Sequence, residues 1–307
     1  MANLKDIQRQ IKSVSNTQKT TRAMKLVSTA KLRRAEELAK RSRLYAQKMN
    51  QVIAEIAGRI QCNKVGGLSK KVLESVGNSE NRMFESIEDP KMVDIVFVTA
   101  DKGLCGGFNI QTIKAVNKLL KEYKAKNVKV RLRGIGKKGI EYFNYNEVEM
   151  LDSVVGLSSK PDKEKSDDFI MTSISDFRDG KIDALHIVYN GYKNMITQEL
   201  HVNQVLPIDA DKFDCKEAES SSMLEIEAED EEKMLDSLVE KYINYNMYYS
   251  LIDSIAAEHS ARMQAMDTAT NNAKEMVKNL NVEFNKARQA AITTELIEII
   301  SGVESMK

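Results

Sequence analysis

A glycine-rich turn in the middle of the chain has the pattern of a phosphate-binding loop. The stretch "VDIVFVTADKGLCGGFN", residues 93–109, leads from a β-branched apolar run through an acidic residue and three glycines into a helical pattern. Such turns often bind phosphate, because the following helix offers free N–H groups at its start. The turn lacks the G-K-[ST] ending of a Walker A loop, and Lys102 precedes its glycines. We therefore expect a tight turn without a bound nucleotide.

A second glycine pattern resembles a dinucleotide fingerprint. Gly134, Gly136 and Gly139 match G-x-G-x-x-G after a strand-like run. In a dinucleotide fold the pattern follows the first strand, with an acidic residue about 20 positions further on. Here it follows the second expected strand, and only residues 137–145 separate it from the next one. The pattern favours a strand-to-helix turn, and we expect no cofactor.

Cys105 is the candidate nucleophile, since a thiol near a helix start has a lowered pKa. A thiol enzyme also needs a base, usually histidine. The three histidines are expected in the middle of a strand, at a strand start and on a coiled-coil seam: His186, His201 and His259. A small buried cysteine is the better interpretation, and we predict no catalytic residue.

Metal and disulfide sites are not indicated either. Cys62, Cys105 and Cys215 are far apart and form no CxxC pair, which fits a reducing compartment. The acidic run "EIEAEDEEKMLD" lacks the ligand and glycine spacing of a calcium loop. We expect no bound metal and a solvated acidic surface.

Charge is divided unevenly, although the formal net charge is only +1. Residues 1–50 hold thirteen Lys or Arg and three Asp or Glu, whereas residues 211–232 hold two and ten. The basic segment 16–35 could contact nucleic acid, but it lacks aromatic residues, so a solvated face or an acidic protein partner is at least as good an interpretation. No apolar run could span a bilayer and no signal peptide is evident, so we expect a soluble, intracellular protein that is at most peripheral to a membrane.

Two long helices must position these features. Neither Gly nor Pro occurs in residues 1–57 or 208–301, so both ends lack the strongest helix breakers. From residue 235 the positions repeat in heptads, which indicates a coiled coil. Helices over about 3–57 and 233–302 would be roughly 80 and 100 Å long. The C-terminal seam consists of Leu235, Leu238, Tyr242, Tyr245, Tyr249, Ile252, Ala256, His259, Met263, Met266, Thr270, Ala273, Val277, Leu280, Phe284, Ala287 and Ala291.

The N-terminal helix has a weaker seam in two parts. Leu4, Ile7, Ile11 and Val14 form the first part. Leu38, Tyr45 and Val52, with Met49 and Ile56, form the second. Because a central domain joins the helices, we expect them to pair as an antiparallel coiled coil.

The centre of the chain reads as an α/β layer. Strand-like runs alternate with helical spacing over residues 90–208, which predicts a Rossmann-like domain with a mostly parallel sheet and doubly wound topology. Ser166 or Asp167 is the expected cap of its last helix. The expected parts are a helix at 1–60, a central domain with its connector at 61–208, an acidic segment at 209–232 and a helix at 233–307.

The C-terminal end has an apolar stripe that leaves the seam. Ile292, Leu296, Ile299, Ile300 and Val303 keep helical spacing, but one position off the heptad. An apolar helix end beyond its pairing partner would be exposed unless another protein encloses it. The stripe therefore predicts that another protein encloses this end of the helix.

Three segments together resemble the gamma subunits of F-type ATP synthases. They are "MANLKDIQRQIKSVSNTQKTTRAMKLVSTAKLRRA", "TADKGLCGGFN" and "VEFNKARQAAITTELIEIISGVES", and the resemblance covers nearly the whole chain. The family's C-terminal pattern, I-T-x-E-x-x-[DE]-x-x-x-G, is matched by Ile292, Thr293, Glu295, Glu298 and Gly302. No inserted cysteine pair is present, so the resemblance is to the bacterial, non-thiol-regulated type.

The resemblance implies a central-stalk rotor without an active site. Its coiled coil would stand inside the ring of alpha and beta subunits, and its α/β domain would lie on the c-subunit ring beside epsilon. The shaft would transmit torque between the proton-driven c ring and the catalytic ring, as a peripheral protein on the cytoplasmic side of the cell inner (plasma) membrane.

The resemblance also implies which residues meet those partners. Arg22, Met24 and Lys25 would face the beta subunits, and Arg288, Gln289, Thr293 and Glu295 would contact the catalytic ring. Two alternatives stay open: a nucleotide-binding α/β enzyme with a coiled-coil arm, and a coiled-coil adaptor that binds nucleic acid.

Overall fold

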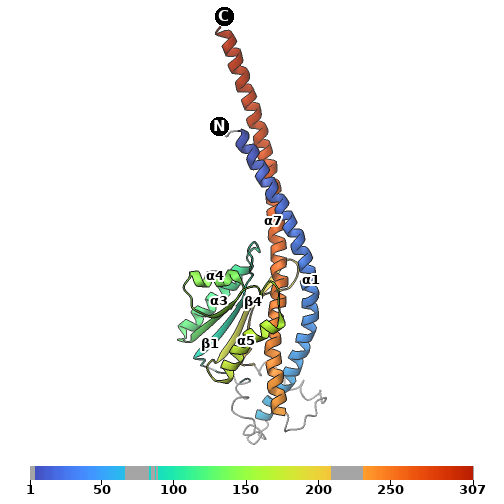
Figure 1. The fold of residues 1–307 in the computed structure, drawn as a ribbon, viewed down its shortest axis with the longest axis vertical. Helices are drawn as coiled ribbons and strands as arrows, with labels where there is room; N and C mark the ends of the chain where they lie inside the picture. Colours follow the sequence, from blue (N-terminus) through green and yellow to red (C-terminus); the bar gives the residue numbers. More distant parts are fainter. Residues whose placement is uncertain (1–3, 66–82, 84–86, 88, 209–230, 307) are drawn as a thin grey trace. The chain divides into compact units, whose positions relative to one another are not determined.

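The computed structural model describes residues 4–65, 83, 87, 89–208 and 231–306 (Figure 1). These residues divide into two compact units. The paired-helix unit comprises residues 1–30 and 262–307, and the sheet unit comprises residues 31–261. The acidic segment expected at 209–232 and most of the connector expected at 61–89 lie outside the described residues, so the four-part division stays a prediction. None of the helices in the described ranges is long and apolar enough to cross a membrane.

Two long helices contribute to both units. Helix α1 spans Leu4–Val65 and helix α7 spans Glu231–Glu304. The expectation that the first helix stops near residue 57 is wrong, because α1 continues through Gly58. A single glycine costs a helix only about 1 kcal/mol, which does not break an already formed helix. The expected bounds of the C-terminal helix, 233–302, agree with α7 to within two residues at each end.

The sheet unit contains a five-stranded sheet with the order β3-β2-β1-β4-β5. Only β5 is antiparallel to its neighbour. This order, with β1 in the middle and crossovers to both sides, confirms the mostly parallel, doubly wound topology. The strands are β1 Met92–Val98, β2 Lys129–Ile135, β3 Met150–Val154, β4 Ala184–Tyr192 and β5 Gln198–Leu206.

Helices cover both faces of the sheet (Figure 1). On one face, α3 (Phe108–Ala125) and α4 (Lys137–Tyr145) pack on a core that includes Phe97 and Phe143. On the other face, α5 (Lys163–Arg178) and α7 share a core that includes Phe177 and Met247. Since β1 is covered on both faces, its sequence reads as one continuous apolar run interrupted only by Asp94.

The start of α5 differs from the sequence prediction. Asp162 is its N-cap, and the Asp162 carboxylate accepts a hydrogen bond of 3.2 Å from the N–H of Lys165. Ser166 and Asp167, the expected caps, lie inside the helix. Asp162 has the extended backbone that capping requires and stands immediately before the first helical residue, so the helix begins one turn earlier.

Charged side chains link the strands inside the sheet unit. Arg131 on β2 donates two hydrogen bonds, of 2.6 and 2.8 Å, to the buried carboxylate of Asp94, its register partner on β1. The side chain of Arg133 is fully buried. Its guanidinium donates to Asp152, to Ser173 and to the carbonyl oxygen of Phe169. These pairs satisfy charges that would otherwise be costly to bury.

In the paired-helix unit, α1 and α7 form an antiparallel pair. Thr270 donates a 2.8 Å hydrogen bond to Thr21, and Lys25 forms a 2.6 Å ion pair with Asp267, so α1 numbering falls as α7 numbering rises. From residue 271 to 291 the heptad positions are the only α7 residues that are not exposed. They are Ala273, Val277, Leu280, Phe284, Ala287 and Ala291, which confirms the predicted seam over this range.

The second part of the predicted α1 seam is confirmed only at Met49 and Val52, which are partly buried, and the side chain of Ile56 lies outside the described residues. Leu38 and Tyr45 are exposed, and the buried positions are instead Leu32, Ala35, Ala39 and Ser42. Small side chains let helix backbones approach closely, and this favours Ala and Ser over Leu at the contact. The first half, with Leu4, Ile7, Ile11 and Val14, is at least partly buried as predicted.

Candidate functional site

The glycine-rich turn is held together by its own side chains. It links β1 to α3, with positive φ angles at Leu104 and Gly106. The side-chain oxygen of Asn109 accepts a 2.8 Å hydrogen bond from the N–H of Ala100, and its amide nitrogen donates to the sulfur of Cys105. These two hydrogen bonds of Asn109 hold the turn to the start of α3.

The same turn packs against α7. Cys105 and Phe108 form a small buried cluster with Ala257 and Ala261, and the ring of Tyr192 covers it. Alanine on the helix and cysteine in the turn leave room for a close approach of the two segments. The buried position of Cys105 confirms the prediction for this residue. Cys62 and Cys215 carry no described side chains.

The G-x-G-x-x-G pattern holds a carboxylate of the chain itself. Asp101, in the first glycine turn, accepts hydrogen bonds of 3.1 Å from the N–H groups of Lys137 and Gly156. It also accepts one from the hydroxyl of Ser159. Burial acts to raise the pKa of the Asp101 carboxyl, but these hydrogen bonds outweigh it and hold the pKa below its ordinary value. Asp101 thus occupies the position at the start of α4 where a phosphate would bind.

The three glycines of this pattern have a packing reason. A Cβ on Gly134 would lie 2.6 Å from the ring of Phe97, and one on Gly139 would lie 2.7 Å from the hydroxyl of Thr99. Gly136 has a φ of +98°, and a Cβ there would collide with the carbonyl oxygen of Thr99. The glycines bring β2 and α4 close to the end of β1, which confirms the strand-to-helix turn.

The histidines occupy structural positions in the sheet unit and on α7. The Nε2 atom of His186 is 2.6 Å from the hydroxyl of Tyr123, and burial lowers the pKa of His186 to about 4. His201 lies inside β5 and not at its start, contrary to prediction, because β5 begins at Gln198. His259 is buried at its predicted seam position. Within the described ranges, no group of three His, Cys, Asp or Glu side chains is arranged to hold a metal ion.

The predicted partner-contact residues all lie in the paired-helix unit. On α1, Arg22 is exposed, Met24 is half-buried and Lys25 pairs with Asp267. The ion pair of Lys25 was missed at the sequence level, since its partner is 242 positions away. The four predicted contacts on α7 are all exposed: Arg288, Gln289, Thr293 and Glu295. None of them belongs to the helix-pair seam, so they are free to meet another molecule.

The last turns of α7 present apolar side chains to solvent. Every residue from 292 to 306 is exposed. The stripe predicted from the sequence is 50–63% exposed at Ile292, Leu296, Ile299, Ile300 and Val303. Ile297, which lies outside the predicted stripe, is exposed as well. An apolar surface of this kind on a helix end is typical of a protein contact.

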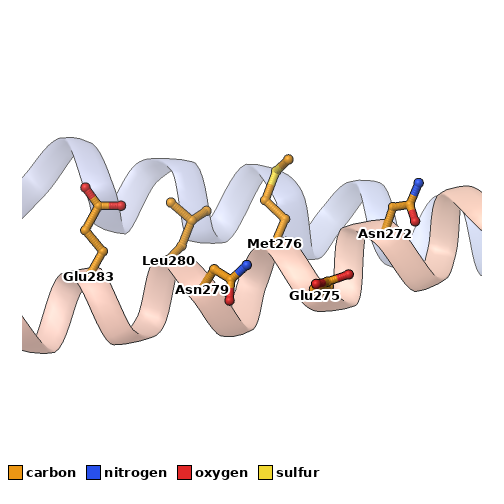
Figure 2. A pocket seen from close by; sticks show the side chains of 6 residues that line it. All are labelled: Asn272, Glu275, Met276, Asn279, Leu280 and Glu283. Carbon is orange, nitrogen blue, oxygen red and sulfur yellow. The ribbon is translucent and has the colours of Figure 1, made fainter.

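A shallow hollow of about 300 Å³ lies further back on α7. Figure 2 shows that the six side chains lining it all come from this helix. Carboxylates and amides surround two apolar side chains there, and Met276 is 53% exposed. The lining consists of Asn272, Glu275, Met276, Asn279, Leu280 and Glu283. The hollow gives the helix a mixed polar and apolar surface that borders its seam at Leu280.

Comparisons with known proteins agree over the full length. The ATP synthase family profile matches residues 3–306. The ATP synthase gamma chain of Sulfurimonas denitrificans is 81% identical over 307 residues, and that of Nitratiruptor sp. is 60% identical, each covering 100% of both chains.

A solved structure has the same fold. The central stalk and c-ring structure of Tetrahymena thermophila mitochondrial ATP synthase contains a chain that aligns with a TM-score of 0.57 at 22% identity. The alignment covers 81% of this chain and 99% of that one. With full-length relatives at such identity, the chain belongs to the ATP synthase gamma chain family.

Proposed function

We propose that the chain is the central-stalk rotor of an F-type ATP synthase. It transmits torque between the proton-driven c-subunit ring and the catalytic ring of alpha and beta subunits. The observation that carries the proposal is the exposed apolar stripe of α7 at residues 292–303, beyond the end of the helix-pair seam. Full-length similarity to ATP synthase gamma chains supports it.

The stripe suits a helix end that is enclosed by other subunits. Five aliphatic side chains at helical spacing would be unfavourable in water, and enclosure by a ring of subunits would bury them. On either side of the last seam residue, Ala291, the exposed side chains Arg288, Gln289, Thr293 and Glu295 supply polar contacts to the same ring. Arg22, Met24 and Lys25 on α1 face the beta subunits.

The sheet unit makes the second set of partner contacts in this proposal. It contacts the c-subunit ring and the epsilon subunit, and through them the chain is peripheral to the plasma membrane on its cytoplasmic side. The solved relative whose fold it shares was determined as a central stalk with a c ring, which supports this assignment.

The chain has no catalytic role of its own in this proposal. Asp101 binds the N–H groups that a nucleotide phosphate would need, and Cys105 is buried against α7. The rival interpretation as a nucleotide-binding enzyme predicts micromolar affinity for ATP or NAD in the isolated full-length chain. A calorimetric titration that finds such affinity would contradict the proposal.

The main experiment removes the apolar stripe without touching the seam. In the assembled complex, deletion of residues 292–307 is expected to weaken assembly with alpha and beta subunits, or to lower ATP-driven proton pumping per ATP hydrolysed. The sheet unit should stay folded, as judged by its thermal unfolding.

A matched pair of variants separates apolar contact from helix length. Ile299→Ser with Ile300→Ser should reproduce part of the defect, whereas Ile299→Leu with Ile300→Leu should not. Normal assembly and pumping after the deletion, or failure of the wild-type chain to co-purify with alpha and beta subunits, would overturn the proposed function.

A further inference from the structure

A buried carboxylate lies where α7 packs on the sheet. Asp253 is only 3% exposed, on a stretch of α7 whose neighbours Leu251 and Ile252 are fully buried. One of its oxygens accepts a hydrogen bond from the backbone N–H of Tyr192 at the end of β4. The other oxygen, Oδ1, is buried without a hydrogen-bond partner among the described residues. An apolar side chain would avoid this desolvation, so the carboxylate is not explained by stability.

A glycine on β4 makes room for this side chain. A Cβ added to Gly191 would lie 2.6 Å from the ring of His201 and closer still to Oδ2 of Asp253. Gly191 has an ordinary backbone conformation, so the close approach of Asp253 and His201 is what excludes a side chain there. The α7 carboxylate therefore reaches the backbone of the strand itself.

Groups from four elements converge on this point. His201 comes from β5, where it is the register partner of Tyr189 on β4. Arg43 comes from α1 and donates a 3.4 Å hydrogen bond to the hydroxyl of Tyr249 on α7. Burial raises the pKa of the Asp253 carboxyl, while the Tyr192 N–H and the charges of His201 and Arg43 oppose that rise. The carboxylate is thus oriented by contacts on the sheet and attracted by α1.

The contacts of Asp253 are directional, unlike those around it. Leu251, Ile252 and Ala256 gain free energy from burial in whichever direction they face, because the hydrophobic effect has no preferred geometry. A hydrogen bond requires a defined distance and angle. Turning α7 by one residue rotates its side chains by about 100°, which would remove the carboxylate from Tyr192 and leave it buried.

From this geometry we propose that Asp253 is a positioning residue that fixes the rotational register of α7 on the sheet. The proposal rests on the proposed rotor function, because register matters when torque passes between the helix and the sheet unit. Apolar packing holds the two together, and the carboxylate prevents the helix from turning against the strand. Gly191 is the second half of the same contact.

The test measures coupling in the whole complex. ATP hydrolysis and ATP-driven proton pumping are recorded on the same vesicles containing the reconstituted ATP synthase. Asp253→Leu is expected to lower pumping per ATP hydrolysed at least threefold, with hydrolysis within twofold of wild type. Asp253→Asn, which keeps an acceptor for the Tyr192 N–H, should retain the wild-type ratio.

Two further variants keep the test decisive. Gly191→Ala should displace the carboxylate sterically and lower the ratio as Asp253→Leu does, and it decides the matter where Asp253→Leu does not assemble. Leu251→Ala, on the same turn of α7, weakens packing without touching the hydrogen bond and should keep the ratio.

The outcomes separate this inference from the proposed function. A wild-type ratio in both Asp253→Leu and Gly191→Ala would overturn it, and so would an equal loss of ratio in Leu251→Ala. A wild-type complex that hydrolyses ATP without pumping would instead contradict the rotor function itself.

Discussion

Helix α7 is buried in two different ways along its length. From Ser250 to Ala261, in the sheet unit, every residue except Ile255 is buried, including polar ones such as Asp253 and Glu258. From residue 271 to 291, in the paired-helix unit, only the heptad seam is covered. A regular heptad alone thus does not tell how much of a helix is enclosed. The heptad pattern predicts only the face of the helix that forms the seam. Whether the remaining faces are buried depends on what else packs against the helix.

The two regions also treat charge differently. In the sheet unit, the Arg133 side chain is fully buried and makes its hydrogen bonds inside the protein. In the paired-helix unit, the Lys25–Asp267 pair has side chains that are 38% and 47% exposed. In the sheet unit, losing one hydrogen-bond partner of Arg133 would therefore lower stability. In the paired-helix unit, substitution of Lys25 or Asp267 should be tolerated.

The largest effect is expected from removing the buried charge. Arg133→Ala leaves Asp152 and Ser173 without their donor and should lower the free energy of unfolding of the sheet unit by about 3–5 kcal/mol. Chemical denaturation of the full-length chain, followed by hydrogen exchange in β2 and β3, measures this. A loss below about 1 kcal/mol would show that the contrast between the two units is overstated.

Acid should affect the sheet unit through His186. Its folded-state pKa is lowered to about 4 by burial, whereas an unfolded histidine titrates near pH 6.5. The unfolded state therefore takes up a proton first, and stability is lost as pH falls from about 6.5 to 4, by an amount on the order of 3 kcal/mol. In His186→Gln, whose side-chain amide can still form a hydrogen bond with Tyr123, that part of the pH dependence should disappear.

The measurement is thermal unfolding between pH 4 and 7, with hydrogen exchange read separately in β4 and in residues 270–291 of α7. Loss of protection on acidification should appear in β4. An unchanged pH profile in the variant would contradict the assignment to His186.

Enlarging an alanine should distinguish the two environments of α7. Ala257→Leu would overpack the cluster with Cys105 and Phe108, and we expect a loss of about 1–3 kcal/mol. The matched change Ala287→Leu lies on the seam, next to open solvent, and should alter stability by less than about 0.5 kcal/mol. Urea unfolding of both variants makes the comparison, and equal losses would argue against it.

The smallest effect is expected at the partly exposed ion pair. Lys25→Ala should cost less than about 1 kcal/mol, because solvent screens the pair with Asp267. The difference from wild type should shrink further at high salt. A loss that persists in 1 M salt would indicate that the pair is more strongly shielded than its exposure suggests.

Elements whose signal is local could be predicted from the sequence. The buried strand β4 falls within residues 90–208, where strand-like runs were predicted, because a strand covered on both faces reads as a nearly continuous apolar run. The α7 seam was predicted for a similar reason, since its heptads repeat without a Gly or Pro. The end of α1 was missed because Gly58 is a weak breaker inside a long helix.

Contacts between distant positions could not be predicted. Asp101 reads as part of a phosphate-binding turn, yet its donors Lys137 and Gly156 are 36 and 55 positions away. Asp253 stands in the heptad pattern as an ordinary polar position, and only the sheet geometry brings it to Gly191. The partner-contact residues on α1 and α7 remain predictions, because their counterparts belong to other chains.

The carboxylate of Asp101 has a consequence for a protein that works among nucleotides. Any phosphate that approached the start of α4 would compete with an acceptor tethered by the same chain, whose effective concentration is in the millimolar range or above. Cellular ATP and inorganic phosphate should therefore leave the shape of the sheet unit unchanged as their concentrations vary. In the proposed rotor, the sheet unit would thus transmit torque without changing conformation in response to ATP or inorganic phosphate.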